Sequence, residues 1–208
     1  MNEEPIVVRV PDGPALEARF GAVEAARGGF VVCHPHPLYG GDMDNPVVVR
    51  AVEVVQAAGY AALRFNFRGA GASEGVHDKG RGEQEDVKAA MSTMASRLRP
   101  GSPVGAIGYS FGAWTAARAT RPGDVPLGLI APPLGMFDFA FLPPAAGRLL
   151  LVAGTRDAYC PVDALHRLAE RAGAEARVIE DADHFFFGKL FPLGEAIGAW
   201  IAGLPRPQ

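Results

Sequence analysis

The sequence predicts an α/β fold in one domain, residues 1–208, built on a mostly parallel twisted sheet with an N-terminal antiparallel hairpin. Two strand-like runs flank Pro11-Asp12-Gly13-Pro14, a turn signal typical of a hairpin. Beyond the hairpin, short apolar runs alternate with segments of helical length. This alternation indicates parallel strands joined by crossover helices, so we expect helices on both faces of the sheet.

The elements follow the chain in a regular order. The predicted strands are 6–10, 16–20, 30–33, 60–67, 103–109, 127–131, 149–153 and 177–179. The predicted helices are 47–58, 83–98, 111–119, 162–172 and 190–204. Asn45 suits the N-cap of the first helix and Pro46 its first turn, while Gly59 marks its end. The second helix opens with acidic residues such as Glu83, which the helix dipole favours at that end.

Composition narrows the classes of partner. The formal net charge is −3, which gives no electrostatic footprint for nucleic acid or an anionic membrane, so a small-molecule partner fits better. The N-terminal segment 1–5 has no cationic start or apolar core, and no apolar run reaches the length of a membrane span. Cys33 and Cys160 make no disulfide framework. We therefore expect a cytoplasmic protein with both cysteines as structural thiols, although Cys160 follows a candidate catalytic residue closely enough to be reactive.

The motif Gly108-Tyr109-Ser110-Phe111-Gly112 lies between a predicted strand and a predicted helix. This context is the one that a nucleophile elbow requires, in which a sharp turn raises the serine hydroxyl above the sheet edge. Glycines two residues before and after the serine allow the strand and helix backbones to cross closely. The motif therefore predicts Ser110 as a nucleophile, and its alternative role is that of a simple helix N-cap.

A second copy of the same pattern surrounds Ser73, at residues 71–75. Ser73 lies six residues beyond Phe67, where its preceding strand is predicted to end, and a polar stretch rather than a helix follows it. We therefore predict that Ser73 is a loop residue and not a nucleophile.

A serine nucleophile needs a base to take its proton and a third group to orient that base. The carboxyl ends of parallel strands form the site edge of an open sheet, so the partners should come just after strands. Asp157 follows the 149–153 strand and His184 follows the last strand. The order Ser110, Asp157, His184 is that of the α/β-hydrolases.

Other acids and histidines fit these roles less well. Asp138 also follows a strand but lies further into its loop, and Asp183 is too close in sequence to His184 for good ring geometry. His166 falls within a helix and His77 within a polar loop. His184 instead precedes an aromatic run, 185–187, that can hold its backbone.

An acyl-transfer site also needs two backbone N–H groups directed at the developing oxyanion. Phe111, directly after the nucleophile, is expected to supply one of them. The other should come from the loop after the third strand, where Pro35 and Pro37 have no N–H. His36 is the first candidate for the second donor and Leu38 the next.

Together, the set Ser110, Asp157 and His184, the loop 34–41 and the segment 66–73 resemble the small bacterial α/β-hydrolases, in particular a compact serine-esterase-like branch with an HPHP-type loop and no cap domain. The resemblance spans nearly the whole chain. It implies a serine carboxyl-ester hydrolase that acts on a small-molecule ester and needs neither a metal nor an organic cofactor. It does not identify the substrate, because the fold serves many activities.

The connection between the strands near residues 131 and 149 has fewer than twenty residues, too few for a helical lid. We expect an open site with a preference for short acyl chains. Leu38, Tyr39 and Phe137 are the predicted substrate contacts. The connection carries residues that could form an acyl-side wall or equally close the core: Pro132, Pro133, Leu134, Met136, Phe137, Phe139 and Phe141.

Rival interpretations remain open at this point. His34 and His36, with Asp42 and Asp44 nearby, would suit a metal-dependent hydrolase, but no further histidine cluster completes a site. The segment 69–74 begins Gly-x-Gly as in dinucleotide-binding proteins, yet its sixth position is Glu and no helix follows directly. The same triad would serve a thioesterase or a peptidase, and a non-catalytic binding module would share the fold.

Overall fold

The computed structural model describes residues 3–120, 123–144 and 148–205; Met1 and Asn2, part of the acidic N-terminal segment, lie outside this range. Its centre is an eight-stranded sheet in the order β1-β2-β4-β3-β5-β6-β7-β8. The strands are β1 (Glu4–Arg9), β2 (Ala15–Gly21), β3 (Gly29–Cys33), β4 (Ala61–Phe65), β5 (Val104–Tyr109), β6 (Leu127–Ile130), β7 (Leu149–Gly154) and β8 (Glu175–Ile179). The β1–β2 and β2–β4 pairs are antiparallel and the other neighbours are parallel, which confirms the predicted sheet.

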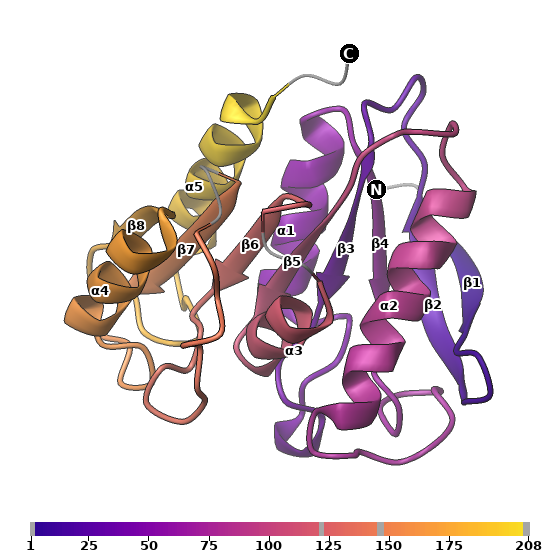
Figure 1. Ribbon diagram of the computed structural model, residues 1–208, viewed down its shortest axis with the longest axis horizontal. Helices are drawn as coiled ribbons and strands as arrows, with labels where there is room; N and C mark the ends of the chain where they lie inside the picture. Colours follow the sequence, from indigo (N-terminus) through magenta and orange to yellow (C-terminus); the bar gives the residue numbers. More distant parts are fainter. Residues whose placement is uncertain (1–2, 121–122, 145–147, 206–208) are drawn as a thin grey trace.

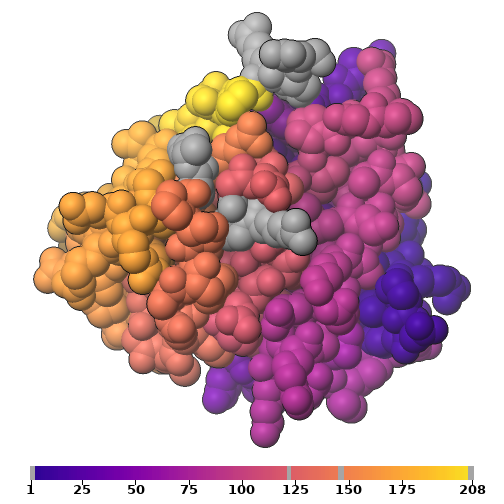
Figure 2. Space-filling view, viewed as in Figure 1, coloured from indigo at the N-terminus to yellow at the C-terminus, as the bar shows by residue number. Residues whose placement is uncertain are grey.

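Helices cover both faces of this sheet. They are α1 (Pro46–Ala57), α2 (Arg81–Ser96), α3 (Phe111–Ala119), α4 (Val162–Ala172) and α5 (Leu190–Gly203), with a short 3₁₀ turn, η1 (Pro37–Tyr39). Figure 1 shows α2, α3 and α4 in front of the sheet and α1 and α5 behind it. In the space-filling view of the same side, α4 and α2 occupy opposite flanks, and the N-terminal hairpin lies beyond α2 (Figure 2). Among the described residues, no helix is both long and apolar enough to cross a bilayer.

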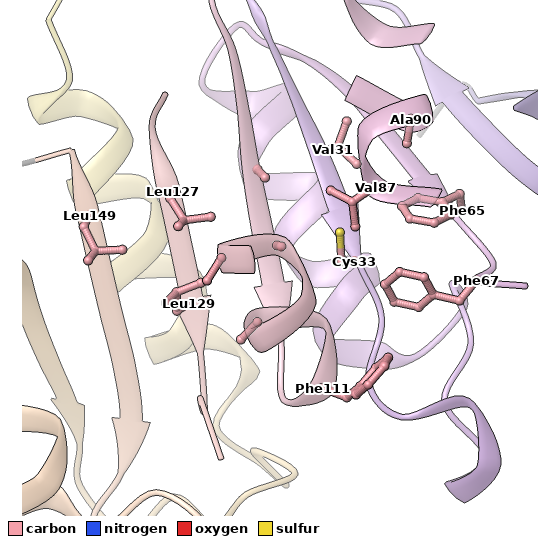
Figure 3. Packing of buried hydrophobic residues seen from close by; sticks show 14 of the residues in the cluster. Val31, Cys33, Phe65, Phe67, Val87, Ala90, Phe111, Leu127, Leu129 and Leu149 are labelled. Carbon is pink, nitrogen blue, oxygen red and sulfur yellow. The ribbon is translucent and has the colours of Figure 1, made fainter. Parts of the chain in front are cut away.

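Each face of the sheet has its own hydrophobic core. On the α2–α3–α4 side, Val31 and Phe65 of the sheet pack in one cluster with Val87 and Ala90 of α2 (Figure 3). On the other side, Val52 of α1 belongs to a second cluster. Burial of apolar surface on both faces holds the strands in place, so their carboxyl ends form a firm edge for a site.

Most element bounds agree with the predictions within two residues, and β4 is the informative difference. It ends at Phe65 rather than at 67, because Asn66 makes the last main-chain bond to β2 and the N–H of Phe67 turns to a side chain instead. The N–H of Asn66 donates to Glu17 O (2.8 Å), and that of Phe67 donates to the His34 ring (2.9 Å). The chain therefore turns away from the sheet directly beside the loop that follows β3.

Two helix starts depend on particular side chains. The Asn45 side chain accepts a hydrogen bond from Val47 N (3.0 Å), as expected of the N-cap of α1. Helix α2 begins at Arg81, two residues before its predicted start, because Glu83 folds back to accept from Gly80 N (2.8 Å). Glu83 is thus a buried capping residue rather than a solvated charge.

Candidate active site

Ser110 lies at the sharp turn between β5 and α3. Its backbone has φ 55° and ψ −118°, a strained combination for a residue with a side chain. Its N–H donates to Ile130 O of the neighbouring strand (2.9 Å), which fixes the turn at the carboxyl edge of the sheet. The hydroxyl makes no capping bond to α3. The geometry is therefore that of a nucleophile elbow and not that of a side-chain N-cap.

Two glycines make this turn possible. A Cβ on Gly108 would collide with the carbonyl oxygen of Gly112, so the strand and the helix cross without room for a side chain. A Cβ on Gly112 would lie 2.5 Å from the carbonyl oxygens of Cys33 and His34, at the end of β3. The second glycine thus lets the first turn of α3 approach the loop that follows β3.

His184 connects the serine to a carboxylate. Its Nε2 lies 2.9 Å from Ser110 Oγ, and its Nδ1 lies 2.9 Å from Asp157 Oδ2 and 3.0 Å from Oδ1. A carboxylate can only accept, so the proton lies on Nδ1 and Nε2 accepts from the serine hydroxyl. The three side chains form one continuous hydrogen-bonded chain, and the imidazole and the carboxylate are almost entirely buried.

The loop after β7 that carries Asp157 (the acid loop) and the loop after β8 that carries His184 (the base loop) are bonded to each other. Asp157 Oδ1 accepts from the N–H groups of Tyr159 (2.9 Å) and Cys160 (3.0 Å), so the carboxylate cannot rotate freely. Arg156 N donates to Ala182 O (2.9 Å) across the two loops. These bonds fix the distance between the turn after β7 and the turn after β8.

Aromatic contacts orient the imidazole itself. The Tyr109 hydroxyl donates to His184 O (2.9 Å), and the Tyr159 ring meets the imidazole edge to face at 4.8 Å. Of the run 185–187, only Phe186 is buried, where it joins the core under β7 and α5. Phe185 and Phe187 are exposed instead. One inward-facing ring rather than three therefore anchors this loop.

Two backbone N–H groups near Ser110 are available to an oxyanion. Within the described residues, the N–H groups of Phe111 and His36 donate to no protein acceptor, whereas Leu38 N donates to His36 Nδ1 (3.2 Å). Leu38 N is thus already engaged in the cap of η1. The arrangement favours His36 over Leu38 as the second donor.

His34 connects the loop 34–41 to the chain that follows β4, and it does not line the cavity. Its ring is fully buried, with Nδ1 2.6 Å from Pro35 O and Nε2 accepting from Phe67 N (2.9 Å). Burial lowers the pKa of His34 to about 4, so the ring is neutral at pH 7. Both ring nitrogens are engaged, which leaves neither for a metal ion. Within the described residues, no group of three or more candidate metal ligands converges.

A cavity of about 320 Å³ opens onto Ser110 and His184. Of the three predicted substrate contacts, Tyr39 and Phe137 line this cavity and Leu38 does not. The remaining lining residues are Pro35, His36, Gly40, Gly41, Asn45, Tyr109, Phe111, Pro133, Met136, Tyr159 and Phe185. No lining residue carries a formal charge when its histidines are neutral.

The 132–141 segment divides between cavity and core. Pro133, Met136 and Phe137 line the cavity, whereas Phe139 is buried in the core on the α3–α4 side and Phe141 packs partly against it. Different residues of this segment therefore line the cavity and close the core, and the acyl-side role of the lining residues stays a prediction.

The rival side chains lie elsewhere or serve local structure. The Asp138 carboxylate accepts from Ala140 N (2.7 Å), and that of Asp183 accepts from Phe185 N (3.0 Å). His166 is exposed on α4. Ser73 Oγ donates to the carbonyl of Asn66 and accepts from the N–H of Glu17 in β2. None of these groups faces Ser110.

Both cysteines are fully buried free thiols. Burial is the first cause that raises the pKa of each thiol, and the nearby Asp157 raises that of Cys160 further. A thiol held protonated and out of solvent is unreactive, so Cys160 is a packing residue beside the acid loop.

Sequence reasoning missed several contributors to the site. Tyr109 and Tyr159 contact His184, although each is adjacent or nearly adjacent to a predicted catalytic residue. His77 was expected only in a polar loop, yet its ring lies 4.7 Å from that of His36. No pattern in the sequence connects residues 36 and 77, because the contact depends on the path of the 66–80 loop.

Comparison with known proteins identifies the family of the chain. The sequence model of the family described as X-Pro dipeptidyl-peptidase (S15 family) matches residues 24–178. The chain is 32% identical over 204 residues to the uncharacterized protein RP471 of Rickettsia prowazekii (strain Madrid E), covering 92% of this chain and 85% of that protein.

Two solved structures are similar over nearly their whole length. An alpha-beta serine hydrolase homologue from Coxiella burnetii is 32% identical with a TM-score of 0.86, covering 96% of this chain and 97% of that one. XC6422 from Xanthomonas campestris, an α/β serine hydrolase without lid, is 30% identical with a TM-score of 0.88, covering 100% and 98%. The chain therefore belongs to the S15 family within the α/β-hydrolases, and it has the lidless serine-hydrolase fold.

Proposed function

We propose that the protein is a carboxylesterase that hydrolyses small esters through an acyl-enzyme, with Ser110 as nucleophile, His184 as base and Asp157 as the orienting acid. The observation that carries the proposal is the chain of 2.9 Å hydrogen bonds from Ser110 through His184 to Asp157, open to an uncharged cavity. The proposal includes a cytoplasmic location, with which two buried free thiols are consistent.

In the first half-reaction, Ser110 Oγ attacks the ester carbonyl carbon while His184 Nε2 takes the hydroxyl proton. The carbonyl π electrons move to oxygen, and the N–H groups of Phe111 and His36 stabilise that oxyanion. When the tetrahedral intermediate collapses, the C–O bond to the leaving group breaks and the alkoxide takes the proton from His184. The products are an alcohol and an acyl ester of Ser110.

In the second half-reaction, water replaces the alcohol. His184 Nε2 takes a proton from the attacking water, a second tetrahedral intermediate forms, and its collapse returns that proton to Ser110 Oγ. A carboxylic acid leaves and the starting hydrogen-bonded chain is restored. Asp157 keeps the imidazole in the tautomer that both half-reactions need, without being protonated itself.

The cavity favours a neutral ester over the dipeptide that the family description suggests. A dipeptidyl substrate carries a free ammonium group that must be paired when it is drawn from water. None of the described residues that line the cavity is an aspartate or glutamate. An apolar wall with Tyr39 and Phe137 instead matches an uncharged acyl group, so peptidase or thioesterase activity is the second candidate.

A fluorophosphonate probe tests the proposal directly. We expect one covalent tag, mapped by peptide mass spectrometry to Ser110, and none on the Ser110→Ala protein. Ser73→Ala is the matched control because Ser73 lies in the same sequence motif, and this variant should still be tagged at Ser110. A folded wild-type sample that takes no tag would support a binding module and reject the hydrolase.

A substrate panel then separates the chemistries. p-Nitrophenyl acetate and butyrate should be hydrolysed by the wild-type protein and not measurably by Ser110→Ala. Higher kcat/KM for Gly-Pro-p-nitroanilide or for an acyl thioester than for these esters would move the assignment to a peptidase or thioesterase on the same three residues.

A further inference from the structure

Three rings meet beneath the predicted oxyanion site. The His36 ring lies 4.7 Å from that of His77 and 4.8 Å from that of Phe111, and the His77 and Phe111 rings are 5.5 Å apart. His36 follows β3, His77 belongs to the loop between β4 and α2, and Phe111 begins α3. The His77 ring therefore contacts the side chains of His36 and Phe111, the two residues whose N–H groups are proposed to hold the oxyanion.

A buried carboxylate fixes the position of His77. Glu83 in the first turn of α2 is fully buried, and its Oε1 lies 2.8 Å from His77 Nδ1. The contact is close but does not have hydrogen-bond geometry, and His77 Nδ1 has no hydrogen-bond partner among the described residues. The same carboxylate accepts from the N–H groups of Asp78 and Gly80, both at 2.8 Å. Glu83 thus fastens residues 77–80 to α2.

The surrounding packing leaves this stretch little freedom. A Cβ on Gly80 would collide with the Trp114 ring of α3, so the loop lies directly against the helix that begins at Phe111. Burial, and next the neighbouring His77, lower the pKa of His36, and its Nδ1 accepts from Leu38 N. His77 itself does not line the cavity.

We propose that His77, held by Glu83, is a positioning residue that sets the two oxyanion N–H groups through the rings of His36 and Phe111. The inference rests on the proposed function, since it assigns a role within that site. An oxyanion donor acts only at a well-defined place, and an error near 1 Å can cost about a hundredfold in rate. Because His77 does not line the cavity, its loss should lower kcat and leave KM nearly unchanged.

Steady-state kinetics on p-nitrophenyl butyrate test the first consequence. We expect His77→Ala to lower kcat about tenfold or more with KM within about twofold of wild type, and to weaken binding of a boronic acid, which mimics the tetrahedral adduct, by a similar factor. His166→Ala, at an exposed histidine on α4, is the matched control and should match wild type. Unchanged kcat in a folded His77→Ala protein overturns the proposal.

A double-variant cycle tests the anchoring by Glu83. Glu83→Gln keeps the side-chain volume and one acceptor oxygen but removes the negative charge. It should lower kcat, as His77→Ala does. If both residues act as one unit, His77→Ala combined with Glu83→Gln should be no slower than the slower single variant. If the double variant's loss of kcat equals the product of the two single losses, the shared positioning role is rejected. It is also rejected if kcat falls only in step with Tm.

Hydrogen–deuterium exchange provides a measure that needs no turnover. In His77→Ala, amides of residues 36–41 should exchange faster than in wild type, while amides of β7 should not change. Faster exchange in a protein that no fluorophosphonate tags would retain the structural link between His77 and the 36–41 segment, and would reject the hydrolase together with the oxyanion role. A tagged, active wild type with unchanged exchange in the variant would retain the hydrolase and reject the positioning role.

Discussion

Tyr109 and His184 are joined by a hydrogen bond of 2.9 Å from the phenol hydroxyl to the main-chain carbonyl oxygen. The residue before the nucleophile thus holds the backbone of the proposed base. Burial, with Asp157 next, raises the pKa of Tyr109, so the hydroxyl remains a donor at all ordinary pH values. The bond joins the two halves of the site independently of the serine.

Tyr109→Phe should therefore slow catalysis as well as weaken the fold. We expect a loss of about 1 kcal/mol in the free energy of unfolding and a severalfold lower kcat, because the base loop loses its fastening to β5. Urea unfolding and ester kinetics measure the two effects. Tyr60→Phe, at a buried tyrosine by the amino end of the sheet, should leave kcat at the wild-type value.

Asp157→Asn should abolish most activity while the protein stays folded. The amide keeps the shape of the carboxylate, but it no longer holds the proton on His184 Nδ1, so we expect kcat to fall about a thousandfold or more. Asp138→Asn is the control, since that carboxylate only caps its own turn. Equal losses in both variants would contradict the assignment of Asp157.

Gly112→Ala should destabilise the protein through a steric clash. Its Cβ would lie 2.5 Å from two main-chain oxygens at the end of β3, and relieving that overlap should cost about 1–3 kcal/mol. Gly203→Ala in α5 meets no atom within 4 Å and should be neutral or stabilising by at most about 1 kcal/mol. Thermal unfolding of both variants decides the comparison.

The residues of the 132–141 segment that line the cavity should set the preferred length of the substrate's acyl chain. Acetate and butyrate esters should be preferred to octanoate, because the cavity is small and no lid extends it. Phe137→Ala removes a lining ring and should shift the butyrate-to-octanoate ratio of kcat/KM by about tenfold toward octanoate. Phe141→Ala, outside the lining, should not shift it. A wild-type preference for octanoate would contradict the short-acyl expectation.

His34 makes folding stability depend on pH in a definite direction. The pKa of its buried ring is lowered from 6.5 to about 4, so between these values the unfolded chain binds a proton that the folded protein does not. This contribution to stability is complete above pH 6.5 and is lost as pH falls toward 4, by roughly 3 kcal/mol in total. Urea unfolding across this range should give a shallower pH slope for His34→Gln than for wild type.

The sequence predicts the local parts of this site well. The elbow follows from two glycines around Ser110, which directly require close backbone crossing. Asp157 and His184 follow from their places after strands, because parallel strands bring such positions to one edge. Their catalytic roles remain proposals, whereas the mostly parallel sheet, the antiparallel hairpin and the absence of a cap are confirmed.

The missed parts depend on tertiary contacts. Leu38 and Tyr39 are adjacent, and only the 3₁₀ turn after β3 decides that Tyr39 faces the cavity. The pairing of His77 with Glu83 depends on a loop whose course is set elsewhere, by the Arg68 side chain and backbone bound to Asp86. Neither hydrophobic period nor motif spacing encodes such contacts.

The bonds between the loops after β7 and β8 have a consequence for how new specificities could arise. Because Asp181 N also donates to Thr155 Oγ1, the loops that carry the proposed acid and base are held to each other by several of the protein's own hydrogen bonds. The segment that supplies Pro133, Met136 and Phe137 to the cavity belongs to a different connection, the one between β6 and β7. Exchanging or lengthening that connection would change which substrates fit the cavity without moving the loops that carry Ser110, Asp157 and His184.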